Sequence, residues 1–308
     1  MIHAEHLTKK YGAKTAVDSI DFTVRPGLVT GFLGPNGAGK STTMRLIVGL
    51  DVPTSGSVTV NGKRYAQHRS PLTEVGALLD AKAVHTGRSA RNHLLAMAAT
   101  HNIGRRRVDE VIAMTGLDSV ASKRVGGFSL GMGQRLGIAA ALLGDPATLI
   151  LDEPVNGLDP EGVLWVRNLV RHLASEGRTI FLSSHLMSEM ALTADHLIVL
   201  GRGKIVADAP IADILSGSTR PTVRFRSPEA ARLANSLTAS TVDITQDGSD
   251  LVQVVGLSAP EIGEIAARSG IVLHELTPLS ASLEEAYMAL TQDDVEYQTT
   301  AITQEVAR

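Results

Sequence analysis

The chain contains no cysteine and few aromatic residues. None of its 308 residues is cysteine, and phenylalanine, tryptophan and tyrosine together make up 3% of the sequence. The absence of cysteine excludes disulfide bonds and thiolate metal sites, and it fits a reducing compartment. Because apolar residues nevertheless reach 44%, the core must be packed mainly with aliphatic side chains.

Long apolar runs and an excess of positive charge are also missing. The longest apolar runs, 138–143 and 196–200, are far shorter than the roughly 20 residues of a membrane-spanning helix. The first residues lack the apolar segment of a secretory signal. If the protein acts at a membrane, we therefore expect another chain to supply the span. A formal net charge of −3 gives no basic footprint for a polyanion, so no nucleic-acid partner is expected.

Apolar runs alternate with amphipathic segments in the first two thirds of the chain. Short apolar runs predict strands at 28–34, 148–152 and 179–184, and helical spacing of apolar residues predicts helices at 40–50 and 163–177. Strands that alternate with helices in this way are typical of a parallel sheet with helices on its faces. The sequence therefore predicts an α/β fold with a mostly parallel sheet.

Two further regions accompany this core. Residues from about 76 to 143 carry helical patterns and predict a helical insert within a first domain at 1–215. After a link rich in serine and glycine, residues 221–291 predict the order β-α-β-β-α-β with a trailing helix, the arrangement of a small α+β ferredoxin-like domain. The last of its strands is expected at 271–276. Residues 292–308 are expected to form a mobile tail.

A phosphate-binding motif lies between the first predicted strand and the helix after it. The sequence GPNGAGKS matches G-x-x-x-x-G-K-S/T. Glycines let backbone N–H groups surround phosphates, and the start of a helix favours negative charge. We expect Lys40 to reach the terminal phosphates as a catalytic residue and Ser41 to bind Mg²⁺. The residues expected to bind the nucleotide in this segment are Gly34, Pro35, Asn36, Gly37, Ala38, Gly39, Lys40, Ser41 and Thr42.

Two adjacent acids follow the second apolar run. The sequence TLILDEP places Asp152 and Glu153 directly after a strand that is expected to be buried. In a phosphate-binding α/β core, an acid at the end of such a strand can reach the metal, which assigns Asp152 to Mg²⁺. Glu153 is then free to orient or deprotonate an attacking water. Taken alone, the pair would be better explained as a helix-capping acid and a surface glutamate, and only its co-occurrence with Lys40 favours catalysis.

Five motifs, in order and in spacing, resemble those of the ATP-binding subunit of ABC transporters over roughly residues 1–215. Beside the loop and the acid pair, FSLGMGQR at 128–135 is similar to the family signature L-S-G-G-Q. NGLDP at 156–160 is similar to the loop that carries an aspartate at the dimer contact, and LSSH at 182–185 is similar to the segment that ends in the switch histidine. The resemblance implies an ATPase that uses ATP and Mg²⁺.

The resemblance also implies nucleotide contacts outside the phosphate loop. Tyr11 occupies the place of an aromatic residue that stacks on adenine. Ser129 and Gly131 belong to the signature, which in the family closes over the ATP of a second subunit, and Asp159 matches the dimer-contacting aspartate. The signature departs from the family pattern at Leu130, which replaces its first glycine. Ser129 is also placed to cap a helix that begins at Leu130.

His185 and Asp80 complete the candidate residues. His185 follows a strand at the same sheet edge as Asp152, and the resemblance implies a catalytic contact with the terminal phosphate. Asp80 stands where the family usually has a glutamine that links Mg²⁺ or water to the transporter interface, so it is a further candidate metal ligand. Similar acids occur in a subgroup of bacterial exporter ATPases of the daunorubicin- and bacitracin-resistance kind. We therefore expect Asp80 to tune coupling to the membrane partner.

The resemblance implies a peripheral ATPase at the cytoplasmic face of the cell membrane, which energises an exporter. Its expected partners are an integral membrane permease subunit and a second copy of itself. A soluble family member acting on ribosomes or DNA is an alternative, but the former usually carry two cassettes in one chain and DNA-end members insert a long coiled coil. An importer ATPase subunit also stays open. A small GTPase would need a guanine-reading N-K-x-D segment, which the sequence lacks.

Overall fold

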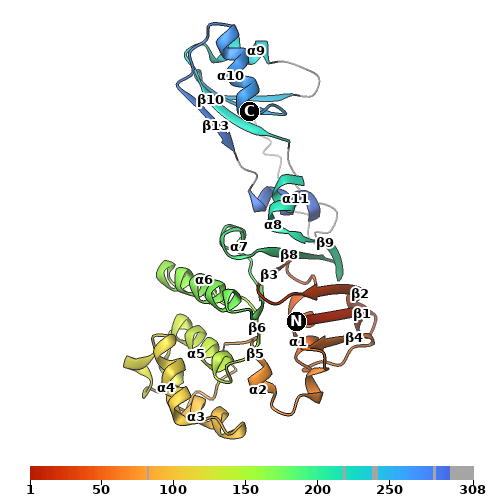
Figure 1. Cartoon of the computed structure of the whole chain (residues 1–308), viewed down its shortest axis with the longest axis vertical. Coiled ribbons are helices and arrows are strands. Elements are labelled where there is room, and N and C mark those ends of the chain that lie inside the picture. Colours follow the sequence, from red (N-terminus) through yellow and green to blue (C-terminus); the bar gives the residue numbers. More distant parts are fainter. Residues whose placement is uncertain (82, 218–219, 238–241, 280–281, 292–308) are drawn as a thin grey trace, which may run out of the picture. The chain divides into compact units, whose positions relative to one another are not determined.

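The computed structural model describes residues 1–308 except 82, 218–219, 238–241, 280–281 and 292–308 (Figure 1). The chain divides into two compact units, of which the first comprises Met1–Ile211 with the described residues from Leu290 onward and the second comprises Ala212–Ala289. The tail predicted at 292–308 lies outside the described residues. In the part of the chain that is described, no helix is both long and apolar enough to cross a membrane.

A six-stranded sheet in the order β5-β6-β7-β3-β8-β9 forms the centre of the first unit. Five of its strands pair in parallel, and the last strand joins β8 in the antiparallel direction. Every residue of β3, β6 and β7 is buried, as in a sheet covered on both faces. The predicted mostly parallel sheet is confirmed. The strands are β3 (Val29–Leu33), β5 (Val75–Leu78), β6 (Thr148–Leu151), β7 (Thr179–Ser183), β8 (His196–Gly201) and β9 (Lys204–Pro210).

Seven helices belong to this unit in the described residues, and Figure 1 shows α3, α4 and α5 gathered beside β5 and β6. Because β5 is a strand, the helical segment begins after residue 78 rather than at about 76. A side chain at Gly76 would lie 2.0 Å from the carbonyl oxygen of Ala141, so only glycine allows α5 to pack this closely on β5. The helices are α1 (Lys40–Ile47), α2 (Pro71–Glu74), α3 (Ala90–Thr100), α4 (Arg105–Met114), α5 (Leu130–Leu142), α6 (Pro160–Ser175) and α7 (Met187–Thr193).

A three-stranded antiparallel sheet packs against the central sheet and carries Tyr11 at the end of its middle strand. It consists of β1 (Ile2–Tyr11), β2 (Lys14–Val24) and β4 (Ser55–Val60) in the order β2-β1-β4. Phe22 of β2 lies 6.3 Å from Phe32 of β3 and 6.0 Å from Phe181 of β7 between ring centroids. In a core that is otherwise aliphatic, these three rings join the two sheets.

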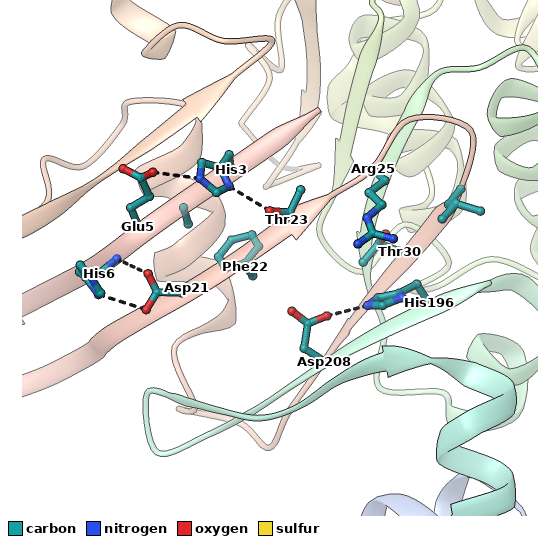
Figure 2. Close-up of a pocket in the computed structure, with 12 residues that line it drawn as sticks. His3, Glu5, His6, Asp21, Phe22, Thr23, Arg25, Thr30, His196 and Asp208 are labelled. Atoms are coloured by element: carbon teal, nitrogen blue, oxygen red, sulfur yellow. Dashed lines mark hydrogen bonds and ion pairs between the residues drawn. The ribbon is translucent and has the colours of Figure 1, made fainter.

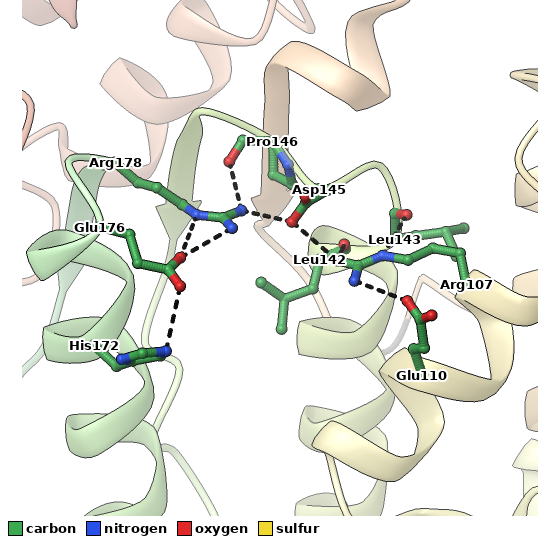
Figure 3. A network of polar contacts seen from close by, with 9 residues as sticks. All are labelled: Arg107, Glu110, Leu142, Leu143, Asp145, Pro146, His172, Glu176 and Arg178. Carbon is green, nitrogen blue, oxygen red and sulfur yellow. Dashed lines mark hydrogen bonds and ion pairs between the residues drawn. The ribbon is translucent and has the colours of Figure 1, made fainter.

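A charged network connects the helical segment to the entry of β7 (Figure 3). Arg107 of α4 donates hydrogen bonds to the carbonyl oxygens of Leu142 and Leu143 and to Oδ1 of Asp145, the last at 3.2 Å. The same Asp145 oxygen accepts a hydrogen bond from Arg178 at 2.8 Å. This bond from Arg178 holds the pKa of the Asp145 carboxyl below its usual value. Asp145 is therefore shared by two cations from different elements.

We expect Asp145→Asn to lower the free energy of unfolding at pH 7 by up to ~1 kcal/mol, because water screens a carboxylate whose side chain is 60% exposed. Asparagine also tolerates the backbone φ of +54° at this position. The depressed pKa means that the contribution is present above the unfolded pKa, about 3.9, and is lost as the pH falls through the folded value.

Urea unfolding of both proteins at a series of pH values measures this difference. The stability gap between them should shrink toward zero below about pH 4. The exposed Asp118 is a matched control, and Asp118→Asn should change stability little at any pH. An Asp145→Asn gap that stays constant from pH 7 to pH 3 would contradict the ion-pair explanation.

The second unit contains a four-stranded antiparallel sheet in the order β11-β12-β10-β13. In chain order these are the second, third, first and fourth strands, which confirms the predicted ferredoxin-like arrangement. The last strand was predicted at 271–276 but begins at Glu275, because Ile271 packs into the core directly after α10. The elements are α8 (Ile211–Gly217), β10 (Thr222–Arg226), α9 (Ala230–Ser236), β11 (Asp243–Asp247), β12 (Leu251–Val255), α10 (Ala259–Arg268), β13 (Glu275–Leu279) and α11 (Leu283–Thr291).

Candidate active site

The phosphate loop joins β3 to α1. Gly37 and Gly39 have φ of +83° and +109°, and a side chain at Gly39 would lie 2.3 Å from the carbonyl oxygen of Ala16. Glycine is therefore required where α1 begins. The ammonium of Lys40 donates hydrogen bonds to the carbonyl oxygens of Gly34 at 2.7 Å and Pro35 at 3.2 Å. The lysine is thus folded back over its own loop.

The carboxylate of Asp152 lies between the phosphate loop and β7. Its Oδ2 accepts a hydrogen bond from the Ser41 hydroxyl at 2.7 Å, and its Oδ1 accepts one from the Ser183 hydroxyl at 2.5 Å. Burial lowers the pKa of the Lys40 ammonium, whereas the nearby carboxylates of Glu153 and Asp152 act in the opposite direction. The ammonium of Lys40 in the loop therefore lies close enough to both carboxylates to interact with them electrostatically.

Glu153 and His185 form a second pair at the same edge of the sheet. Nδ1 of His185 lies 2.6 Å from Oε2 of Glu153, and the His185 backbone N–H donates to the same oxygen at 3.2 Å. Glu153 has φ of +50°, a left-handed conformation that is uncommon outside glycine. The carboxyl ends of parallel strands meet at one sheet edge, which explains why residues after β3, β6 and β7 converge.

Three oxygen-bearing residues fit the requirements of Mg²⁺. Ser41, Asp80 and Asp152 line one cavity of about 600 Å³. Within the described residues there is no cluster of three histidine or acidic groups that could hold a metal by protein ligands alone. Mg²⁺ commonly binds through one or two carboxylates together with substrate phosphates. The oxygens of this cavity therefore fit Mg²⁺ delivered with a nucleotide.

Tyr11 is connected through Asp51 to α1, the helix that follows the phosphate loop, and these bonds fix the orientation of its side chain. Its hydroxyl donates to Asp51 at 2.9 Å, and Asp51 also accepts a hydrogen bond from Arg45 of α1 at 2.8 Å. The Lys9 ammonium lies 4.9 Å from the centre of the Tyr11 ring. Partial burial and the bond to Asp51 raise the pKa of the Tyr11 phenol. Tyr11 is 48% exposed, which leaves area for stacking with an aromatic base.

The signature residues are not joined to the phosphate loop. Ser129 caps α5 by accepting a hydrogen bond from the backbone of Met132 at 3.2 Å, which confirms the predicted helix start. Asp159 caps α6 in the same way. A side chain at Gly131 would lie 3.1 Å from the carbonyl oxygen of Gly157, so the two segments are neighbours. Among the described residues, no hydrogen bond connects Ser129, Gly131 or Asp159 to residues 34–41.

Two buried polar residues of the site were missed by the sequence analysis. Ser183 is fully buried and contacts both acids, and Gln134 of α5 donates to the backbone carbonyl of Glu153 at 2.7 Å. In the segment LSSH, only the histidine matched a known functional residue of the family, the switch histidine. A hydroxyl at the end of a buried strand was the available signal for Ser183, since such a group needs a partner.

A cavity of about 730 Å³ lies among β1, β2, β3, β8 and β9, away from these residues (Figure 2). Histidines and carboxylates line it in three separate pairs, His3 with Glu5, His6 with Asp21 and His196 with Asp208. Each histidine is held by its own carboxylate and the three pairs do not converge. No metal cluster is present there among the residues that the structure describes.

Known proteins are similar to this chain in sequence and in fold. A family model described as ABC transporter matches residues 17–156. The bacitracin transport ATP-binding protein BcrA of Bacillus licheniformis is 35% identical over 297 residues, which cover 94% of this chain and 97% of that protein. The chain belongs to the ABC transporter family.

Further matches agree with membership of the ABC transporter family. The Nod factor export ATP-binding protein I of Rhizobium sp. (strain N33) is 32% identical over 307 residues, which cover 94% of this chain and 96% of that protein. A solved ATP-binding subunit of an ABC transporter superposes with a TM-score of 0.65 at 26% identity, over 70% of this chain and 92% of that one. Residues 221–284 match a domain of unknown function (DUF8746). The chain is an ABC-type ATPase that binds ATP and hydrolyses it to ADP and phosphate.

Proposed function

We propose that the chain is the ATPase subunit of an exporter. It works at the cytoplasmic face of the membrane with a separate permease subunit and a second copy of itself. The observation that carries the proposal is the convergence of Lys40, Ser41, Asp152, Glu153 and His185 at one sheet edge. The name of one relative, a bacitracin transport protein, supports a role in transport, and the name of another, a Nod factor export protein, supports export over import.

In this proposal the phosphate loop and three oxygen-bearing residues hold the nucleotide and Mg²⁺. The Lys40 ammonium exchanges its bonds to the loop carbonyls for the terminal phosphates, which are better acceptors because they are charged. Ser41, Asp152 and Asp80 are the protein oxygens available to Mg²⁺. When bound, Mg²⁺ neutralises charge on the phosphates and orients them.

Glu153 acts as the general base. Its carboxylate accepts a proton from a water molecule whose oxygen bonds to the terminal phosphorus, while the bond from that phosphorus to the bridging oxygen of ADP breaks. His185 lies 2.6 Å from the same carboxylate, which supports a role in orienting Glu153, and we assign it a hydrogen bond to the terminal phosphate. The products are ADP and inorganic phosphate.

A second copy completes each site. Ser129 is exposed at the start of α5, a helix of 13 residues, and Asp159 is exposed at the start of α6. The N-terminus of a helix attracts anions, and the Ser129 hydroxyl, which accepts the capping bond, still has its own proton to donate. Because these residues have no bond to their own phosphate loop, we assign Ser129 to the ATP held by the partner copy and the Asp159 carboxylate to the contact between the two copies. Tyr11 serves as the stacking surface for adenine.

We place the permease contact in the cavity that holds Asp80. Its walls include the apolar residues Val48, Leu50, Leu79 and Met97, and Leu50 is 59% exposed. We assign this apolar wall, in which Leu50 is the exposed residue, to packing against an apolar segment of the permease. Because Asp80 and Asp152 line the same cavity, a permease segment bound there would sense the metal site. This shared wall supports a role of Asp80 in coupling.

The test is affinity purification of tagged Glu153→Gln from detergent-solubilised membranes in Mg-ATP, followed by mass spectrometry. We expect one or two polytopic membrane proteins in near-equal amount. Adding Leu50→Asp should reduce their yield several-fold, because a charge would be desolvated in the contact. Leu192→Asp, at a leucine that is 55% exposed but outside the cavity, is the matched control and should leave the yield unchanged. Recovery of only ribosomal or DNA-processing proteins would refute the transporter assignment.

A further inference from the structure

The two acids of the site share one hydroxyl group, that of Ser183. Ser183 is the last residue of β7 and is fully buried. The register pairs Leu151 of β6 with Leu182 of β7, so Asp152 and Ser183 are the next residues on the two strands. The strand pairing itself therefore brings this serine beside the acid pair.

The contacts of Ser183 reach both acids. Its hydroxyl donates to Oδ1 of Asp152 at 2.5 Å and accepts a hydrogen bond from the backbone N–H of Glu153 at 2.9 Å. A hydroxyl offers one donor and two acceptor positions, so both bonds can form at once. The other carboxylate oxygen of Asp152, Oδ2, is left for Ser41 and the proposed metal position.

The backbone of Glu153 is held from two sides. Ser183 satisfies its N–H and the Gln134 side chain satisfies its C=O, at 2.9 Å and 2.7 Å. This support is needed because a non-glycine residue with φ of +50° is in the strained left-handed region of backbone conformation. We expect that without it Glu153 would relax and its carboxylate would leave the position beside His185.

We propose that Ser183 is a positioning residue that fixes the Asp152 carboxylate for Mg²⁺ and the Glu153 backbone for catalysis. It does not touch the reacting atoms and acts only through the two acids. The inference rests on the proposed roles of Asp152 and Glu153. Replacement of groups that orient metal ligands typically costs about 10–100-fold in metal affinity or activity.

The test compares nucleotide affinity with and without Mg²⁺ in the full-length protein. For each variant, the Kd of ATP is measured in Mg²⁺ and in EDTA, and Mn²⁺ affinity is measured by electron paramagnetic resonance with a non-hydrolysable ATP analogue. Ser183→Ala should leave the EDTA value within about twofold of wild type. It should weaken Mn²⁺ binding by about 10-fold or more and lower turnover in the same range.

Two further variants separate positioning from simple loss of stability. Ser227 in the second unit is also fully buried, donates to the Val272 carbonyl and accepts from the Glu229 backbone, so Ser227→Ala removes an equivalent pair of bonds. It should lower the melting temperature but leave Mn²⁺ affinity unchanged. Ser183→Thr keeps the hydroxyl and should restore metal binding. If Ser183→Ala does not fold, Ser183→Cys, whose thiol is a weak donor and acceptor, takes its place in the comparison.

Failure of the Ser183 proposal can be distinguished from failure of the proposed roles of Asp152 and Glu153. If folded Ser183→Ala binds Mn²⁺ and turns over like Ser227→Ala, the positioning role of Ser183 is overturned while the assignments of Asp152 and Glu153 stand. If the wild-type protein itself shows no effect of Mg²⁺ on ATP affinity, the metal role of Asp152 is wrong. Loss of Mn²⁺ affinity in Ser183→Ala together with its recovery in Ser183→Thr supports the proposal.

Discussion

Glu153→Gln is expected to lower steady-state ATP hydrolysis by at least about 10²-fold, because glutamine cannot accept the proton of the attacking water. The substitution keeps the size of the side chain and its hydrogen-bonding oxygen, so binding of Mg-ATP should stay within a few-fold of wild type. Phosphate release at saturating Mg-ATP measures the first value, and equilibrium binding of a fluorescent ATP analogue measures the second.

A glutamate outside the site provides the control for Glu153→Gln. Glu264 is exposed on α10 of the second unit, and Glu264→Gln should leave turnover unchanged. If Glu153→Gln retained more than about a tenth of the wild-type rate, a different group would be the base. His185 would then be the next candidate, since it is in direct contact with Glu153 at 2.6 Å.

Lys40→Met is expected to weaken ATP binding by about 10- to 100-fold, since hydrogen bonds to charged groups contribute roughly 1.5–3 kcal/mol. Methionine keeps the apolar stem of the side chain and removes only the ammonium. In the wild-type structure this ammonium donates hydrogen bonds to the carbonyl oxygens of Gly34 and Pro35. Turnover at low ATP concentration should fall at least as much. Isothermal titration with Mg-ATP measures the affinity.

A lysine outside the site provides the control for charge alone. Lys63 is exposed after β4, and Lys63→Met should leave ATP affinity unchanged. Wild-type affinity in Lys40→Met would show that the ammonium does not contact phosphate and would remove the main support for the loop assignment. A parallel loss of affinity in both variants would point to a general effect of net charge.

The sequence was sufficient to predict the phosphate loop and the parallel sheet because both depend on local patterns. The loop needs glycines at fixed positions before a helix, and Gly39 is the position where a side chain would strike the Ala16 carbonyl. The buried strands are continuous apolar runs, which is typical of a sheet covered on both faces. In the second unit, local patterns predicted the succession of strands and helices along the chain, and that succession is typical of a ferredoxin-like sheet.

Other features depend on contacts between distant segments and could not be read from local patterns. The strand β13 was placed too early because Ile271 is apolar for packing after α10 and does not extend a strand. The bond of Ser183 to Asp152 joins residues 31 positions apart, and that of Tyr11 to Asp51 joins residues 40 positions apart. Pairings of this kind depend on strand register and on the loop after α1.

The central claim is that two copies of the chain complete each other's ATP site, and sedimentation of Glu153→Gln tests it most directly. The variant binds Mg-ATP without consuming it, so the closed pair should accumulate. We expect a dimer in Mg-ATP and a monomer in ADP, and we expect Ser129→Glu, which places a negative charge at the partner's phosphates, to prevent the dimer. A monomer in Mg-ATP, together with wild-type hydrolysis whose rate per chain does not depend on protein concentration, would contradict the account.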